Sequence, residues 1–340
     1  MYSFTNDYSE GAHENILKAL LESNLKQSAG YGLDEYCDKA KYILKNILKN
    51  DKVDIHFIPG GTQVNLICIS AFLKQYEAAI AADTGHIAVH ETGSIESCGH
   101  KVITANSNDG KLTVDKIEKI LKIHIDEHMV KPKLVYISNS TEIGTIYKKQ
   151  ELIDLYTYCK EKNLLLFIDG ARMGSAITSY ESDLELSDLV NLCDAFYIGG
   201  TKNGALFGEA LIICNESLKE DFRYNIKQKG ALLAKGRLLG VQFIELFKDD
   251  LFFNLAKHAN EMATLLQDAL IEQNYKLLIK SPTNQIFPIL PNSSIEKLRG
   301  KYSFNTFEEY DENNTIIRLV TSWATEKENV LEFISDLKSL

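Results

Sequence analysis

The sequence IGGTKNG at residues 198–204, together with FIDGAR at residues 167–172, decides the fold. Each stretch follows or ends a short apolar run, residues 195–198 and 164–168, of the kind that forms a buried strand. The charged side chains therefore emerge at two strand ends, which is where open α/β sheets bind their ligands. This arrangement predicts that the lysine of the first stretch and the aspartate of the second belong to one site.

A lysine among glycines, with an aspartate and an arginine from a neighbouring strand, provides the groups that hold pyridoxal phosphate (PLP). Lys202 can form an imine with the cofactor aldehyde, and Asp169 can pair with the protonated pyridine nitrogen, so that the ring accepts electrons. An ordinary lysine, with a pKa of roughly 10.4, is mostly protonated at neutral pH, so the site must lower that pKa or supply the aldehyde in place. Each stretch alone also fits an ordinary solvated turn, but their occurrence together favours the cofactor site.

Other polar stretches also follow predicted strands. PGGT at residues 59–62 leads from a strand at 55–58 into an amphipathic helix, where backbone N–H groups can hold a phosphate, although a structural glycine turn fits equally well. His86 follows a strand at 78–82 and is a candidate to lie against a planar ring and move protons, although a lone histidine is more often structural. The loop at 139–144 is polar enough to line a site.

The alternation of strands and helices predicts an α/β fold with a mostly parallel central sheet, because it is typical of right-handed βαβ units. We expect an N-terminal arm at residues 1–13, a large cofactor-binding domain at 14–247 and a small C-terminal α+β domain at 248–340. In the small domain Arg318 lies among β-branched residues, where a buried guanidinium needs a substrate carboxylate or a structural acid as its partner. The apolar spacing predicts helices at 14–23, 35–48, 114–124 and 149–162, and further strands at 101–105, 133–138, 209–214 and 315–321.

Composition narrows the class of protein. The net charge of −10 over 340 residues argues against a nucleic-acid or anionic-membrane partner, because both require clustered cations. The sequence has no apolar run of about 18 residues and its start lacks the features of a signal peptide, so we expect a cytoplasmic protein. Six scattered cysteines without a C-x-x-C pair predict neither disulfides nor a metal site, and no nucleotide-binding glycine motif is present.

Together these residues resemble the threonine aldolase and aromatic amino acid β-eliminating lyase family of PLP enzymes, which has fold type I of the aspartate aminotransferase superfamily. The likeness covers nearly the full length, and DGAR followed by the lysine turn is its most specific pair. It also runs through TND at 5–7, YG at 31–32, PGGT at 59–62, GH at 85–86 and RLVT at 318–321. The family often has a histidine-containing loop where this chain has Ser140, Thr141 and Glu142, which changes the charge beside the expected substrate side chain.

The resemblance implies a role for individual residues. Lys202 carries the cofactor, Asp169 meets the pyridine nitrogen, His86 stacks on the ring, and His128 is similar to the family's second active-site histidine. The implied cofactor contacts are Gly60, Gly61, Thr62, His86, Asp169, Arg172, Thr201 and Lys202, with Lys229 and Arg237 reaching across from a partner subunit. The implied substrate contacts are Asn6, Tyr31, Arg172 and Arg318.

The implied activity is cleavage of a β-hydroxy-α-amino acid, such as threonine or allo-threonine, to glycine and an aldehyde. The implied assembly is a homodimer or homotetramer with sites at the dimer interface. A PLP-dependent β-eliminating lyase or aminotransferase is an alternative, because released Lys202 could act as the base that these reactions need. A third possibility is a protein that binds PLP without catalysing a reaction. Such a protein would not need His86 or either arginine around the cofactor.

Overall fold

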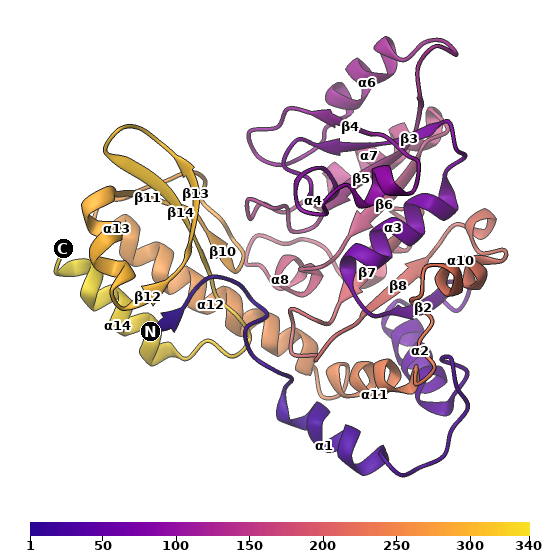
Figure 1. The fold of residues 1–340 in the computed structure, drawn as a ribbon, viewed down its shortest axis with the longest axis horizontal. Coiled ribbons are helices and arrows are strands. Elements are labelled where there is room, and N and C mark those ends of the chain that lie inside the picture. The colour runs from indigo at the N-terminus through magenta and orange to yellow at the C-terminus, as the bar shows by residue number, and fades with distance from the viewer.

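A seven-stranded sheet forms the centre of the larger of two lobes in the computed structural model, which describes residues 1–340 (Figure 1). The strand order is β2-β8-β7-β6-β5-β3-β4. Only β8 runs antiparallel to its neighbours, because a short connection joins it to β7, so the prediction of a mostly parallel sheet is confirmed. The strands are β2 (Asp54–Ile58), β3 (Glu77–Ala82), β4 (Val102–Ala105), β5 (Lys131–Ser138), β6 (Leu165–Asp169), β7 (Ala195–Gly199) and β8 (Glu209–Ile213).

Helices pack on both faces of this sheet, and successive strand residues enter opposite cores because side chains alternate along a strand. Leu166 and Ile168 of β6 enter one core, and Leu165 and Phe167 enter the other. The helices of the larger lobe are α1 (Glu14–Ser23), α2 (Glu35–Ile47), α3 (Gly61–Phe72), α4 (His86–Val89), α5 (Ser94–Ser97), α6 (Val114–Ile123), α7 (Lys149–Glu161), α8 (Met173–Ile177), α9 (Leu186–Leu189), the 3-10 helix η1 (Glu216–Leu218), α10 (Phe222–Gln228) and α11 (Arg237–Leu246).

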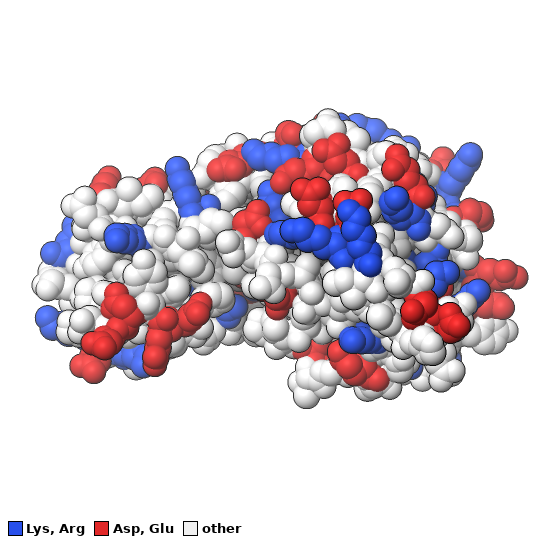
Figure 2. Space-filling view, turned by 90° about the horizontal axis from the view of Figure 1, so that it is seen from above, with Lys and Arg blue, Asp and Glu red and all other residues white.

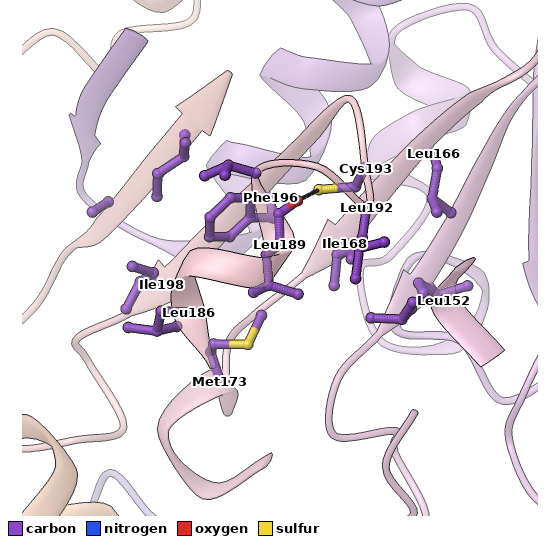
Figure 3. Close-up of a cluster of buried hydrophobic side chains, with 14 of the residues drawn as sticks. Leu152, Leu166, Ile168, Met173, Leu186, Leu189, Leu192, Cys193, Phe196 and Ile198 are labelled. Atoms are coloured by element: carbon purple, nitrogen blue, oxygen red, sulfur yellow. Dashed lines mark hydrogen bonds between the residues drawn. The ribbon is translucent and has the colours of Figure 1, made fainter. Parts of the chain in front are cut away.

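Figure 3 shows part of the first core, where strands β6 and β7 meet α8 and α9. Ile168 and Phe196 pack with Leu189 of α9 and Met173 of α8. The Cys193 thiol donates to the Leu189 carbonyl at 3.2 Å, and burial raises its pKa well above the ordinary range. This thiol therefore behaves as a small apolar side chain, and all six cysteines of the chain are unpaired.

The smaller lobe contains the C-terminal part of the chain and the first residues of the N-terminus (Figure 1). Strand β1 pairs with β12, and Phe4 is buried in the core of this lobe, so part of the predicted arm packs as a structural element. Helix α12 contributes Phe252 to the larger core and Leu266 to the smaller one, so it serves both lobes. The elements are β1 (Tyr2–Ser3), α12 (Leu251–Glu272), β9 (Lys276–Leu277), β10 (Gln285–Ile286), β11 (Pro288–Pro291), α13 (Asn292–Arg299), β12 (Tyr302–Ser303), β13 (Asn305–Glu309), β14 (Asn314–Val320) and α14 (Lys327–Lys338).

The space-filling view shows the two lobes separated by a narrower waist, with acidic and basic side chains interspersed over the larger lobe (Figure 2). A cleft of about 380 Å³ lies between the lobes, lined from the larger one by Asp83, His90 and Glu142 and from the smaller one by Phe307 and Arg318. None of the helices combines the length and apolar character that crossing a bilayer requires. The loops that follow β3 and β5 thus face the smaller lobe.

Candidate active site

Lys202 lies in the turn between β7 and β8, and a buried glutamate holds that turn in place. Glu209 accepts the Gly200 N–H at 3.0 Å and the Thr201 hydroxyl at 2.8 Å, while Asn203 donates to the Phe252 carbonyl. Burial and the Arg172 guanidinium lower the pKa of Lys202, against the opposing effect of nearby carboxylates. A lysine with a lowered pKa is a better nucleophile at neutral pH, as expected for a lysine that forms an imine with the cofactor aldehyde.

Asp169, at the end of β6, is buried and surrounded by hydrogen-bond donors. Tyr197 and the Ala171 N–H donate to Oδ1, and Tyr136 and Asn65 donate to Oδ2. Burial alone would raise the pKa of Asp169, but His86 and the donated hydrogen bonds lower it below its usual value. The site therefore maintains a buried negative charge at the end of β6.

His86 begins α4 and its ring is held by a second buried carboxylate. Its Nδ1 lies 2.9 Å from Glu91 Oε1, and Asn65 donates to the same oxygen at 2.7 Å, which links His86 to Asp169 through Asn65. Burial lowers the pKa of His86, but the hydrogen bond to Glu91 and the charges of nearby carboxylates raise it overall. His86 therefore lies close to Asp169, and Glu91 fixes the orientation of its ring.

The second histidine of the cleft is His90, and the prediction for His128 is wrong. His128 lies in an exposed turn before β5, with its backbone N–H donating to Asp126. Because β5 points its carboxyl end at the cleft, this turn lies at the opposite edge of the sheet. His90 lines the cleft instead, and its ring centre is 5.6 Å from that of His86. The sequence indicated this pair by the spacing of four residues between the two histidines, since residues four apart lie on the same face of a helix.

Arg172, which follows β6, is engaged by the N-terminal segment. Its Nε and Nη2 donate to the two oxygens of Asp7 at 2.8 and 3.1 Å, and Asn284 from the smaller lobe donates to Asp7 at 2.9 Å. The side chains of Arg172 and Asp7 are only 7% and 1% exposed. Burial lowers the pKa of Arg172, but the Asp7 carboxylate raises it, and the overall shift is upward. Asp7 was part of the sequence pattern but had no predicted role, and it ties three parts of the chain together.

Arg318 lines the cleft on β14 and has unused hydrogen-bonding capacity. Its Nη2 lies 3.5 Å from the Thr5 carbonyl, and its buried Nε has no partner. Burial and the neighbouring Arg172 lower the pKa of Arg318, although a guanidinium stays charged at all ordinary pH values. A free buried donor at the edge of a cleft suits an incoming carboxylate.

The predicted phosphate-binding turn lies at the start of α3. Gly60 is the N-cap residue and its helix has no side-chain cap, so the first N–H groups of Gly61 and Thr62 are available to a ligand. A Cβ on Gly61 would lie 3.0 Å from the Tyr197 hydroxyl, which itself binds Asp169. This close approach places the helix N-terminus beside the aspartate.

Several predicted contacts lie away from this cluster within one chain. The Asn6 side chain accepts from Tyr8 and Ser9 of its own loop. Tyr31 is 43% exposed, with Lys227 over its ring at 4.5 Å. Lys229 lies 3.7 Å from the Cys98 sulfur, and Arg237 donates to the carbonyls of Lys26 and Asn24. Within one chain, Tyr31, Lys229 and Arg237 thus contact groups other than Lys202. Asn6 differs, because it lies next to Asp7 and close to Tyr8, whose ring centre is 5.9 Å from the Lys202 amine.

Glu209 is a site residue that the sequence did not indicate, because it reads as the first residue of an apolar strand. Burial raises its pKa to about 8, although the bonds from Thr201 and Gly200 act against this. The folded protein therefore binds a proton at Glu209 in a pH range where the unfolded chain, with a pKa near 4.5, does not.

We expect this difference to make the wild-type protein less stable as the pH rises from about 5 to 8, with no further loss from this group above that range. A Glu209→Gln variant cannot lose the proton, so its melting temperature should fall less across the same window. Thermal unfolding of both proteins at several pH values tests this. Parallel curves would show that folding does not raise the pKa of Glu209.

The residues present fit PLP, on three observations. Lys202 has a lowered pKa, Asp169 keeps a negative charge in a buried position, and the uncapped start of α3 lies beside Asp169. Four donors already fill the acceptor positions of the Asp169 carboxylate, so a ring N–H that binds there has to displace one of them. Asn65 is one such donor, and its own Oδ1 has no partner.

The fold and the site define a PLP-dependent enzyme of fold type I. An aspartate aminotransferase variant from Thermus thermophilus, at 14% identity, superimposes over 100% of this chain and 92% of its own with a TM-score of 0.74, which reflects the shared fold. The chain belongs to the beta-eliminating lyase family, whose model matches residues 9–291.

Two relatives cover almost the entire chain. The low specificity L-threonine aldolase of Pseudomonas aeruginosa is 33% identical over 98% of this chain and 96% of its own length. A solved structure of Leishmania major threonine aldolase is 51% identical, with a TM-score of 0.99 over 100% of this chain and 99% of that one. The similarity therefore spans both lobes and the N-terminal segment that contains Asp7.

Proposed function

We propose that this chain is a PLP-dependent carbon–carbon lyase that cleaves β-hydroxy-α-amino acids of the threonine and allo-threonine type to glycine and an aldehyde. The observation that supports this most is the grouping of Lys202, Asp169 and His86 near the cleft that Arg318 lines, in a chain similar from end to end to threonine aldolases. A member of the family that only binds PLP would not need Arg318 in the cleft.

Lys202 would hold the cofactor covalently, Asp169 would bind its pyridine nitrogen, and the N-terminus of α3 with Gly60, Gly61 and Thr62 would hold its phosphate. Thr201 would contribute through the turn it shares with Lys202, since its hydroxyl is bonded to Glu209. When bound, PLP supplies an electron sink that stabilises negative charge at the substrate Cα. Glu91 holds the His86 ring in one orientation, which suits it to lie against the cofactor.

Arg318 is the proposed anchor of the substrate carboxylate, because its buried Nε is free. Arg172 would assist mainly with Nη1, since Asp7 occupies its Nε and Nη2. Asp7 thus acts as a positioning residue that fixes the Arg172 fork before a substrate arrives. A substrate carboxylate held between Arg172 of the larger lobe and Arg318 of the smaller one would lie close to the N-terminal segment, which also contacts both lobes.

We further propose a homodimer or homotetramer in which Tyr31, Lys229 and Arg237 complete the site of a partner. Tyr31 is exposed, and Lys229 and Arg237 contact groups other than Lys202 within one chain, which supports this. The basic character of the surface that Lys227 and Arg223 share with Tyr31 also supports it. A cytoplasmic location is proposed from the six unpaired cysteines, since reducing compartments keep thiols free.

The test is to incubate the PLP-loaded protein with L- and D-threonine, both allo-threonine isomers and phenylserine, and to quantify aldehyde and glycine. We expect both products in equal amounts from at least one isomer. Aldehyde from none of them, with pyruvate formed from serine instead, would contradict the aldolase function and favour the β-eliminating alternative. The Arg318→Ala variant should lose activity mainly through a higher KM, by roughly 2–5 kcal/mol of apparent binding energy.

A further inference from the structure

Glu142 is a carboxylate in the cleft that the site described above does not use. It lies in the loop after β5 and lines the cleft together with His90 and Arg318. It also lines the adjoining pocket between Thr84 and Tyr136, which extends toward the buried end of β5. Because Glu142 and Arg318 line the same cleft, a substrate whose carboxylate binds Arg318 would also lie close to Glu142.

None of the cations around Glu142 forms an ion pair with it. Its charge affects the pKa values of His86, Lys202 and Arg318, beside the larger effect of burial on each. Arg172, which also responds to Glu142, is bonded to Asp7, and Arg318 reaches only the Thr5 carbonyl. The Glu142 carboxylate forms no hydrogen bond or ion pair of its own, so its acceptor positions are available to a ligand.

His86 is less suited than Glu142 to receive a proton from a substrate. Its Nδ1 is bonded to the buried Glu91, and its pKa is raised, which favours the protonated ring that donates rather than accepts. An ionised carboxylate is an acceptor only. Three groups that line the cleft can accept a proton, namely Asp83, His90 and Glu142. Asp83 already accepts from the Ser107 N–H, so Glu142 is the carboxylate of the cleft without a hydrogen-bond partner.

We propose that Glu142 binds the β-hydroxyl of the substrate and accepts its proton during cleavage. The inference rests on the proposed aldolase function. As the β-O–H bond breaks, its proton passes to a Glu142 oxygen and its electron pair forms the carbonyl of the aldehyde. The Cα–Cβ bond breaks at the same time, and its electron pair stays with the glycine fragment, which then takes up a proton at Cα.

The same position limits the substrate class. A fixed carboxylate beside the β-substituent repels an acidic side chain, and Val89, Ile143 and Phe307 give the cleft an apolar wall. The preferred substrates are therefore β-hydroxy amino acids whose side chain is uncharged, including aromatic ones.

Binding without turnover tests the contact directly. In PLP-loaded Lys202→Ala protein, the affinities for threonine isomers are compared with that for 2-aminobutyrate, which lacks only the hydroxyl, by titration of the visible absorbance. Adding Glu142→Ala should reduce the preference for the hydroxylated ligand by about tenfold or more, the value of a hydrogen bond to a charged group. Glu127→Ala, at an exposed glutamate on the opposite edge of the sheet, should leave the preference unchanged.

In protein with Lys202 intact, Glu142→Ala should slow aldehyde release by about 10²–10⁴-fold while proton exchange at the Cα of glycine continues, since glycine has no β-hydroxyl. An unchanged binding preference, or aldehyde release at the wild-type rate, would overturn the role of Glu142. A wild-type protein that releases no aldehyde would instead contradict the proposed function, and the two failures are thus distinguished.

Discussion

Lys202→Ala should remove the covalent link between protein and cofactor and reduce aldehyde release below detection. The purified wild-type protein should be yellow, and borohydride should fix the cofactor to a peptide that contains Lys202. The reason is that only this lysine lies in the turn after β7 beside Asp169, with a pKa lowered by burial. Mass spectrometry of the borohydride-treated protein identifies the modified peptide.

The matched control is Lys122→Ala, an exposed lysine of α6 whose ion-pair partner is Glu118. This variant should retain the trapped cofactor on the Lys202 peptide. Trapping that persists unchanged in Lys202→Ala would show that another lysine binds the cofactor.

Asp7→Ala should destabilise the protein by about 3–5 kcal/mol, because it leaves the Arg172 guanidinium buried without its partner. It also removes the acceptor of the Asn284 amide and so weakens the contact between the lobes. The free energy of unfolding, measured in urea, reports the loss. Adding Arg172→Met should recover a large part of it, since the buried charge is then absent as well.

Glu10→Ala is the control for that experiment. Glu10 lies in the same N-terminal segment but is exposed and accepts only from Ser322, so its loss should cost less than about 1 kcal/mol. Equal destabilisation by Asp7→Ala and Glu10→Ala would mean that Asp7 does not support Arg172.

The sequence predicted the parts of the site that depend on local pattern. A buried strand followed by polar residues is visible in any window that contains it, so the ends of β3, β6 and β7 could be located before the structure was known. In a parallel sheet those ends meet at one edge, which brings His86, Asp169 and Lys202 together without further information.

The missed residues depend on contacts between distant parts of the chain. Asp7 meets Arg172 and Asn284 only after both lobes have formed, and nothing near residue 7 indicates such partners. Glu209 resembles an exposed strand end until β8 is placed beside the lysine turn. His128 was predicted by resemblance to a family position, whereas the actual neighbour of His86 is His90, which the short helix α4 places one turn later.

The contribution of α12 to both lobes was also beyond local pattern. A single helix, α12, has apolar residues on its N-terminal part for the larger core and on its C-terminal part for the smaller one. A continuous amphipathic helix shows no break where it passes from one core to the other.

The most direct test of the aldolase function is the identity of the products formed from threonine by the PLP-loaded wild-type protein, followed by proton NMR with Lys202→Ala as the blank. Cleavage of the Cα–Cβ bond predicts glycine and acetaldehyde in equal amounts and no product in the blank. The appearance of 2-oxobutanoate, without acetaldehyde from any threonine or allo-threonine isomer, would show β-elimination and contradict the aldolase function.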